Sequence, residues 1–160
     1  MKNRKAFLST MIFVVLLSSI LVGCGGVPKV EWELKVTGEV QTPLTLDYGM
    51  LVAMPQVDLT DILMQKSLGE DEVVSWSGVP LDEILSKAGA GNYSSITATA
   101  ADGYAIEISA DEVEGAIIAL KKGGDWITKA EPDKGPIRLV CPETPANRWV
   151  FQIKEIVLNP

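Results

Sequence analysis

The sequence predicts a β-rich α+β domain in which short strands form mixed sheets and a few short helices accompany them. Three observations support this class. Apolar residues alternate with polar residues over short segments, turns containing glycine or proline separate these segments, and helices do not regularly follow strands. A regular βαβ architecture is therefore not expected.

The first strand is expected at the start of the domain. Trp32, Leu34 and Val36 alternate with charged and polar residues before Gly38, which is the period of a half-buried strand. The elements expected next are a strand at 44–46, one or two helical turns at 48–54 ending before Pro55, and an extended segment at 57–64.

The segment "GVPLDEILSKAGA" predicts a short amphipathic helix. Pro80 suits the first helical position, and Gly89 fits the end of the helix. One apolar face is formed by Leu81, Ile84, Leu85 and Ala88.

The segment "SITATAADGYAIEIS" predicts a hairpin whose turn is Asp102-Gly103, where glycine supplies a positive φ angle. Ser109 and Glu112 have the spacing of a capping box and should open a short helical turn that Gly115 ends. The main role expected for Asp102 is therefore to shape the hairpin.

The last third of the chain predicts further strands at 116–120 and 156–158, with a loop at 121–125. Alternation over 137–141 places Cys141 on the same face as Ile137 and Leu139, so this thiol is expected to be a small buried hydrophobe. Arg138 lies inside the same apolar strand. A buried charge is normally paired, and we expect its partner to be Asp102.

The N-terminus resembles a bacterial lipoprotein signal. Basic residues within the first five positions precede an apolar run over 11–22 that is too short to span a bilayer comfortably. The run ends in a lipobox-like "LVGC", so Cys24 is the expected site of lipid attachment. The predicted organisation is a signal peptide at 1–23, a lipid-anchored tether at 24–30 and one domain at 31–160, located outside the cytoplasm at the cell membrane.

Composition limits the partners of this domain. Three of the 14 basic residues lie in the predicted signal, so the mature part has 11 basic against 21 acidic residues, a net charge of −10. Nucleic acid is not an expected partner, because phosphate binding needs a concentrated basic surface. The chain has no histidine, which excludes Ser/His/Asp and Cys/His nucleophilic sites. The acidic runs at 70–72 and 111–112 are interpreted as solvated charges.

Four segments carry a resemblance to a known family: "GVPLDEILSKAGA", "ADGYAIEIS", "GPIRLVCP" and "RWVFQIKEIVL". In this order and with these gaps, they resemble the molybdopterin-binding domain of the sulfite oxidase family of oxidoreductases. The resemblance implies a mixed α+β fold built on several sheets. Complete family enzymes hold molybdenum on a pterin dithiolene, with a protein cysteine as a further ligand, and oxidise sulfite or reduce substrates such as sulfoxides.

This sequence departs from the family pattern at the metal ligand. The ligating cysteine is expected upstream of "GVPL", but Lys66 or Gln65 stands about there, and neither replaces a soft sulfur donor. Arg148 matches the basic residue that helps to hold the pterin phosphate, whereas Phe151 replaces a lysine expected after it. The further candidates for the cofactor cleft, with core packing as the alternative, are Trp76 and Trp149.

Two functions follow from these observations. The preferred hypothesis is a non-catalytic domain that binds a small anionic ligand or a partner protein and carries no cofactor. The alternative is a molybdopterin-dependent oxidoreductase, or its accessory subunit, that holds the pterin through Arg148 and backbone amides. The first is preferred because a metal site without its sulfur ligand has lost the group that fixes its geometry and redox potential.

Overall fold

The structure, a computed structural model, describes residues 26–160. The predicted signal peptide and Cys24 lie outside these residues. The strands are β1 (Glu33–Gly38), β2 (Leu44–Asp47), β3 (Val57–Met64), β4 (Glu72–Pro80), β5 (Ser95–Ala100), β6 (Ala105–Ser109), β7 (Ile117–Lys122), β8 (Asp125–Trp126), β9 (Arg138–Val140), β10 (Val150–Phe151) and β11 (Ile153–Asn159). The α-helices are α1 (Tyr48–Ala53), α2 (Leu81–Ala88) and α3 (Ile127–Ala130), and the 3-10 turns are η1 (Asp111–Val113), η2 (Pro132–Lys134) and η3 (Ala146–Arg148).

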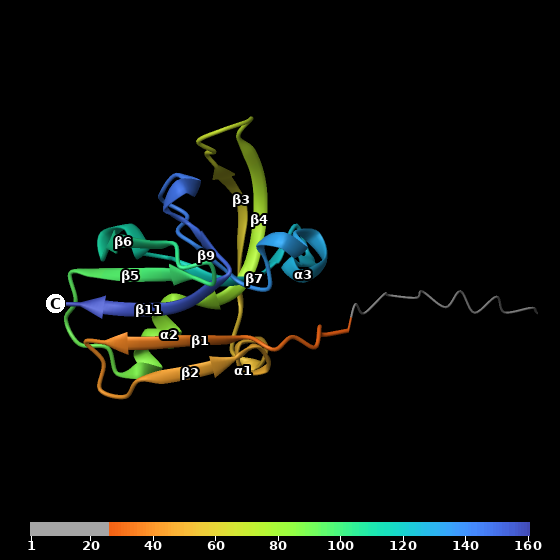
Figure 1. Cartoon of the computed structure of the whole chain (residues 1–160). Coiled ribbons are helices and arrows are strands. Elements are labelled where there is room, and N and C mark those ends of the chain that lie inside the picture. Colours follow the sequence, from red (N-terminus) through yellow and green to blue (C-terminus); the bar gives the residue numbers. More distant parts are fainter. Residues whose placement is uncertain (1–25) are drawn as a thin grey trace, which may run out of the picture.

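These strands form two sheets (Figure 1). One sheet has the order β2-β1-β11-β5-β6, and the other has the order β10-β9-β7-β4-β3, with β8 also paired to β7. β1 runs parallel to β11, whereas the other neighbouring strands run antiparallel. The predicted α+β class with mixed sheets is confirmed.

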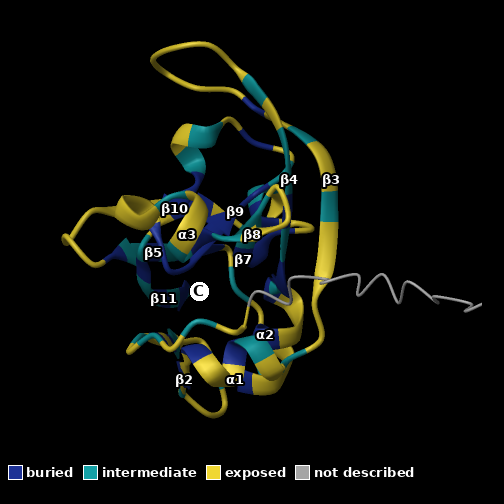
Figure 2. Ribbon diagram, turned by 90° about the vertical axis from the view of Figure 1, so that its right-hand side faces the viewer, coloured by how far each residue is buried: buried dark blue, intermediate teal, exposed yellow. Residues whose placement is uncertain are grey.

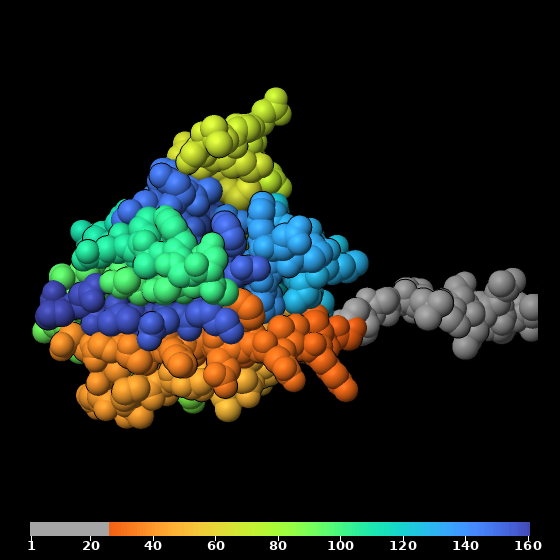
Figure 3. All heavy atoms as spheres, in the orientation of Figure 1, coloured from red at the N-terminus to blue at the C-terminus, as the bar shows by residue number. Residues whose placement is uncertain are grey.

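A single apolar core connects the two sheets with helix α2, and the buried ribbon in Figure 2 marks its position. Leu34 and Val36 are fully buried on β1, in agreement with the alternation that predicted this strand. Trp76 contributes the largest fully buried side chain, from the middle of β4. The β3–β4 hairpin extends beyond this core as an exposed arm (Figure 3).

Helix α2 begins one residue later than its sequence predicts. Pro80 is the N-cap with extended backbone and also the last residue of β4, so Leu81 is the first helical residue. The end of the helix is as predicted, because Gly89 has a φ angle of +66° and adopts the left-handed conformation. The four residues of the predicted apolar face are all buried.

β4 is a strand that alternation did not predict. Its pairing with β3 shifts between Leu59 and Ile62, and its pairing with β7 shifts between Ser77 and Gly78. Each shift interrupts the period of two, so buried residues no longer alternate regularly along the strand. The sequence signal for this strand is therefore weak even though β4 lies between β3 and β7.

The loop predicted at 121–125 is shorter in the structure. β7 continues through Lys121 and Lys122, which pair with Trp126 and Asp125 of β8. Gly123 and Gly124 alone form the turn, with φ angles of +58° and +87°. This turn requires two positive φ angles, which glycine adopts without a steric cost.

The predicted hairpin at Asp102-Gly103 joins β5 to β6, and Gly103 has a φ angle of +88°. No helix within residues 26–160 is long and apolar enough to cross a bilayer.

Candidate functional site

A half-open cavity of about 310 Å³ lies where the β5–β6 turn meets β9, η3 and β10. One wall is formed by Trp149 and the apolar side chains around it, and the guanidinium of Arg138 lies at the same cavity. The lining residues are Ala100, Asp102, Tyr104, Arg138, Ala146, Asn147, Trp149, Val150 and Phe151. The cavity therefore combines segments that are far apart in the sequence.

Hydrogen bonds around the η3 turn fix the position of Trp149. The indole Nε1 of Trp149 donates to the carbonyl oxygen of Cys141 at 2.7 Å, and Thr144 Oγ1 donates to the same oxygen at 3.0 Å. The side chain is 3% exposed. Trp149 is thus both a core residue and a wall of the cavity.

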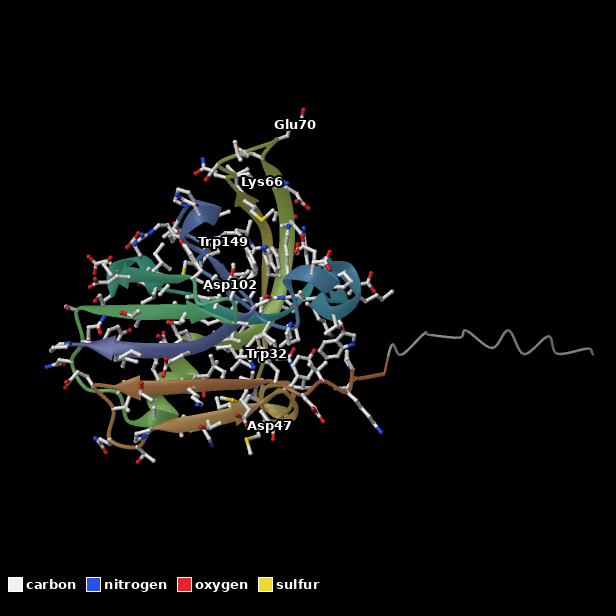
Figure 4. The ribbon with its side chains drawn as sticks, in the orientation of Figure 1. Trp32, Asp47, Lys66, Glu70, Asp102 and Trp149 are labelled. Atoms are coloured by element: carbon white, nitrogen blue, oxygen red, sulfur yellow. The ribbon has the colours of Figure 1, made fainter. Side chains whose placement is uncertain are left out.

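The end of β3 also approaches the cavity. The backbone N–H of Ala146, a lining residue, donates to the carbonyl oxygen of Gln65 at 2.9 Å. Figure 4 labels Lys66 on the hairpin arm, with Trp149 and Asp102 below it in that view. The position where the family resemblance implies the metal-ligating cysteine therefore lies beside the η3 turn.

Arg138 lies beside two indole rings that contact each other. Its Cζ lies 5.2 Å from the ring centroid of Trp76 and 5.4 Å from that of Trp149. The two rings are nearly perpendicular to each other, at 87°. The residue is only 6% exposed, so cation–π contacts replace much of the hydration that the guanidinium loses.

The ion-pair partner of Arg138 is Glu131, and the predicted partner Asp102 is wrong. Arg138 Nη1 lies 3.7 Å from Glu131 Oε2, too far for a hydrogen bond. Asp102 Oδ1 instead accepts the backbone N–H of Tyr104 at 2.9 Å, which is its expected role in the hairpin turn. Burial lowers the pKa of Arg138, and the negative charge of Glu131 opposes this effect.

The guanidinium has unused hydrogen-bonding capacity. Nε and Nη1 are enclosed and have no hydrogen-bond partner within residues 26–160. Nη2 is not one of these enclosed atoms, and none of the hydrogen bonds within residues 26–160 comes from it. Arg138 can therefore donate N–H groups to an acceptor that enters the cavity.

Glu131 belongs to a chain of ion pairs that runs to the hairpin arm. Lys122 Nζ lies 3.1 Å from Glu131 and 3.2 Å from Glu72, and Lys66 lies 3.1 Å from Glu72. The hydrogen bond from Lys66 is the main cause that lowers the pKa of Glu72. The interpretation of Glu72 as a simply solvated charge is therefore wrong.

Arg148 is engaged by a carboxylate. Its Nε and Nη2 donate to the two oxygens of Glu112, each at 2.7 Å, and Nη2 also donates to the Glu107 carbonyl at 2.9 Å. These bonds lower the pKa of Glu112 to about 2. Glu112 Oε2 also accepts the backbone N–H of Ser109 at 3.0 Å, so one half of the predicted capping box is present. Glu112 lies in the first turn of η1, as expected for a helix-start charge, but it is ion-paired rather than simply solvated.

Cys141 is fully buried, as predicted, although both faces of the segment 137–141 are buried. Burial raises the pKa of its thiol to about 12. The reactive thiolate is therefore scarce at neutral pH.

Sequence patterns did not reveal the partners of the two arginines. Glu112 lies 36 residues from Arg148, and its local pattern indicates a capping residue or a solvated charge. Glu131 lies in a turn-rich segment with no periodic signal. Strand pairing and the η turns bring these carboxylates to the arginines, so local spacing carries no information about them.

The fold and the cavity together define a mixed-sheet α+β domain with a buried arginine at a site of ligand size. The chain belongs to the oxidoreductase molybdopterin binding domain family, whose model matches residues 24–160. The structure is similar to the sulfane dehydrogenase SoxCD from Paracoccus pantotrophus, with a TM-score of 0.72 and 19% identity over 84% of this chain. This chain spans 40% of that protein's length, and the likeness shows the fold alone. No curated protein matches the chain.

The residues in and around the cavity do not fit the family's molybdenum cofactor. Lys66, beside the expected thiolate position, is ion-paired with Glu72, and the thiol of Cys141 is buried. The charge of Arg148 is neutralised by Glu112, and Phe151 presents an apolar ring to the cavity. Within residues 26–160, no cluster of three or more Cys, His, Asp or Glu side chains could hold a metal ion.

Proposed function

We propose that this chain is a non-catalytic, lipid-anchored domain outside the cytoplasm that binds a small anionic ligand at Arg138. One observation carries this proposal: Arg138 is only 6% exposed, yet it lines a cavity of about 310 Å³ and its Nη2 is not among its enclosed nitrogens. A buried cation with a weak ion-pair partner is costly for the free protein, and an anion in the cavity would offset its charge and accept an N–H from Nη2.

The surroundings of the cavity support binding without redox chemistry. Arg148, which would hold the pterin phosphate, is already paired with Glu112. Lys66 stands about where the metal-binding thiolate is expected, and it is paired with Glu72. Rebuilding that site would require breaking the Arg148–Glu112 pair and supplying a sulfur ligand. The domain has kept the family fold and changed the chemistry of its cleft.

Metal and pterin analysis tests the non-catalytic role. The full chain is purified from a host that makes the molybdenum cofactor, and molybdenum and pterin fluorescence are measured per mole of protein. We expect neither at stoichiometric level. A Lys66→Cys variant and a Gln65→Cys variant, purified in parallel, show whether the thiol alone would restore binding. Stoichiometric molybdenum in the unmodified chain would overturn the proposal.

Anion binding is tested by thermal unfolding at constant ionic strength. At least one small anion should raise the Tm of the unmodified protein, because a ligand that binds only the folded state stabilises it. The matched variant Arg138→Gln should lose this shift. A shift of equal size in both proteins would mean that Arg138 does not bind the anion.

The second candidate function is a molybdopterin-dependent oxidoreductase, or an accessory subunit of one. The family match over residues 24–160 favours it. This alternative predicts stoichiometric cofactor, either in the isolated chain or in a complex captured from membranes of the native host.

The lipid anchor is tested separately. Membrane fractionation and labelling with a fatty acid should place the unmodified chain in the membrane fraction with bound lipid. The Cys24→Ser variant should lack the label, because the thiol is the attachment point. Labelling of that variant would contradict the prediction.

A further inference from the structure

The charge, the hydrogen-bond donors and the walls of the Arg138 cavity specify a class of ligand. This inference rests on the anion site proposed above. We propose that the ligand is a small monocarboxylate with a flat apolar body, such as an aromatic carboxylate, rather than a phosphate or sulfate ester.

The cavity offers one cation that is only partly compensated. Arg148 is neutralised by Glu112, and Lys122 lies between Glu72 and Glu131. The carboxylate of Glu131 is shared by Lys122, Lys134 and, at the longer distance of 3.7 Å, Arg138. With Asp102 in the same cavity, this single positive charge suits a ligand with no more than one negative charge.

A second negative charge would be unfavourable in this cavity. Asp102, itself a carboxylate, lines the same space as Arg138. Dianions such as phosphate are normally held by several cations or by a row of backbone N–H groups, because each oxygen needs a donor. The positive charge at this cavity can balance a carboxylate but not a dianion.

The geometry of the guanidinium also favours one small acceptor group. Nε and Nη1 are enclosed, and the rings of Trp76 and Trp149 lie beside the guanidinium. Access from the cavity is therefore restricted to the Nη2 side. A carboxylate fits this approach, because one of its oxygens can accept an N–H of Nη2 while its compact head enters beside the two rings.

The remaining walls favour an apolar body. Ala100, Ala146, Val150, Phe151 and the indole of Trp149 line the cavity next to the arginine. A volume of about 310 Å³ equals roughly ten water volumes at about 30 Å³ each, which suits a ligand of on the order of ten non-hydrogen atoms. Aromatic walls bind a flat ring by stacking or by edge contact.

The test is a titration of the full chain, in detergent, with matched probes at constant ionic strength. Benzoate and phenylacetate have both the carboxylate and the apolar ring. Acetate lacks the ring, and benzamide lacks the negative charge. Phenylphosphonate and inorganic phosphate carry more negative charge. Tryptophan fluorescence and calorimetry report binding. We expect benzoate or phenylacetate to bind at least about tenfold more tightly than every other probe.

Two variants locate the site. Arg138→Gln should abolish carboxylate binding, and Ala146→Leu should weaken it by filling the cavity without changing a charge. Far-UV circular dichroism and the Tm establish that each variant is folded. Unchanged benzoate binding in both folded variants would overturn the assignment of the ligand to this cavity.

The outcomes test the ligand class separately from the proposed anion-binding function. Tight binding of phosphate or phenylphosphonate that depends on Arg138, with weak binding of carboxylates, would overturn the ligand class and leave the anion site intact. Binding of no anion by the unmodified chain would overturn both the ligand class and the proposed anion-binding function.

Discussion

Arg148 and Glu112 form a two-point ion pair, with Nε and Nη2 of the arginine each 2.7 Å from a carboxylate oxygen of the glutamate. The pair ties the η3 turn beside the cavity to the η1 turn after β6. Arg148, which the family resemblance matches to a phosphate-binding residue, thus has a structural partner within its own chain.

This ion pair predicts a loss of stability at acid pH. The folded pKa of Glu112 is about 2, below its ordinary value of 4.5, so the pair stabilises the protein above pH 4.5 and loses its effect as pH falls toward 2. Both side chains are about a third exposed, so we expect about 1 kcal/mol after solvent screening. Urea unfolding at about pH 6 and about pH 3 measures it.

Glu112→Gln is the matched variant for that experiment. It should be less stable than the unmodified protein at about pH 6, and the difference should shrink as pH falls below the ordinary pKa of the carboxyl group. A difference that is the same at both pH values would show that the charge of Glu112 does not stabilise the fold.

Removing Glu131 should cost more stability than removing Arg138. Glu131→Leu leaves Lys122 and Arg138 as partly buried cations without their shared carboxylate, whereas Arg138→Met leaves Glu131 with Lys122 and Lys134. We expect a cost of about 3 kcal/mol for Glu131→Leu and less than about 1 kcal/mol for Arg138→Met, because an unpaired buried charge is the expensive outcome.

Denaturant unfolding of the two single variants and the double variant measures this difference. The double variant also gives the coupling energy between the two residues. If Arg138→Met were the more damaging single change, the central position of Glu131 in the ion network would be wrong.

Cys141 should react slowly with thiol reagents in the folded protein. Its side chain is fully buried and its pKa is raised to about 12, so thiolate and access are both limited. In a Cys24→Ser background, Cys141 is the remaining thiol, because the sequence has two cysteines. We expect labelling about a hundredfold slower than after unfolding in denaturant.

The control for this experiment is an exposed thiol in the same protein. Leu68 is 89% exposed at the end of the hairpin arm, so Leu68→Cys should be labelled rapidly. Equal rates at positions 68 and 141 would show that the strand around Cys141 opens readily.

Two glycines should respond differently to alanine. A Cβ at Gly78 would lie 2.1 Å from the Ile118 carbonyl oxygen on the neighbouring strand, whereas a Cβ at Gly103 would meet nothing within 4 Å. Gly103→Ala then carries only the cost of its positive φ angle, about 1 kcal/mol. Gly78→Ala forces strands β4 and β7 apart and should cost about 3 kcal/mol or more.

Thermal and denaturant unfolding of both glycine variants checks this order. Equal losses of stability would mean that the close approach of β4 and β7 at Gly78 is relaxed in solution.

Local signals were sufficient for much of the fold. Helix α2 follows from four apolar residues at helical spacing and a closing glycine, and the β5–β6 hairpin follows from Asp102-Gly103 between alternating segments. β4 was missed because register shifts on both sides interrupt its alternation. Local patterns predict elements whose burial is regular and miss those in which bulges disturb it.

The cavity was predictable only in part. Arg138 and Trp149 were recognisable as residues of interest, and the absence of a cysteine near Lys66 was visible directly. The partners of both arginines were not, since Glu112 and Glu131 come from turns that contain no sign of their contacts.

The sequence by itself determined the class of the fold, the family resemblance and the absence of a cysteine upstream of the "GVPL" segment, because residue identity and local spacing suffice for these. Only the tertiary structure decided which carboxylate pairs with which arginine. It also decided that Arg138 is the cation that lines the cavity. The physical reason is that ion pairing depends on distance in space, and strand pairing brings together charges that the chain separates.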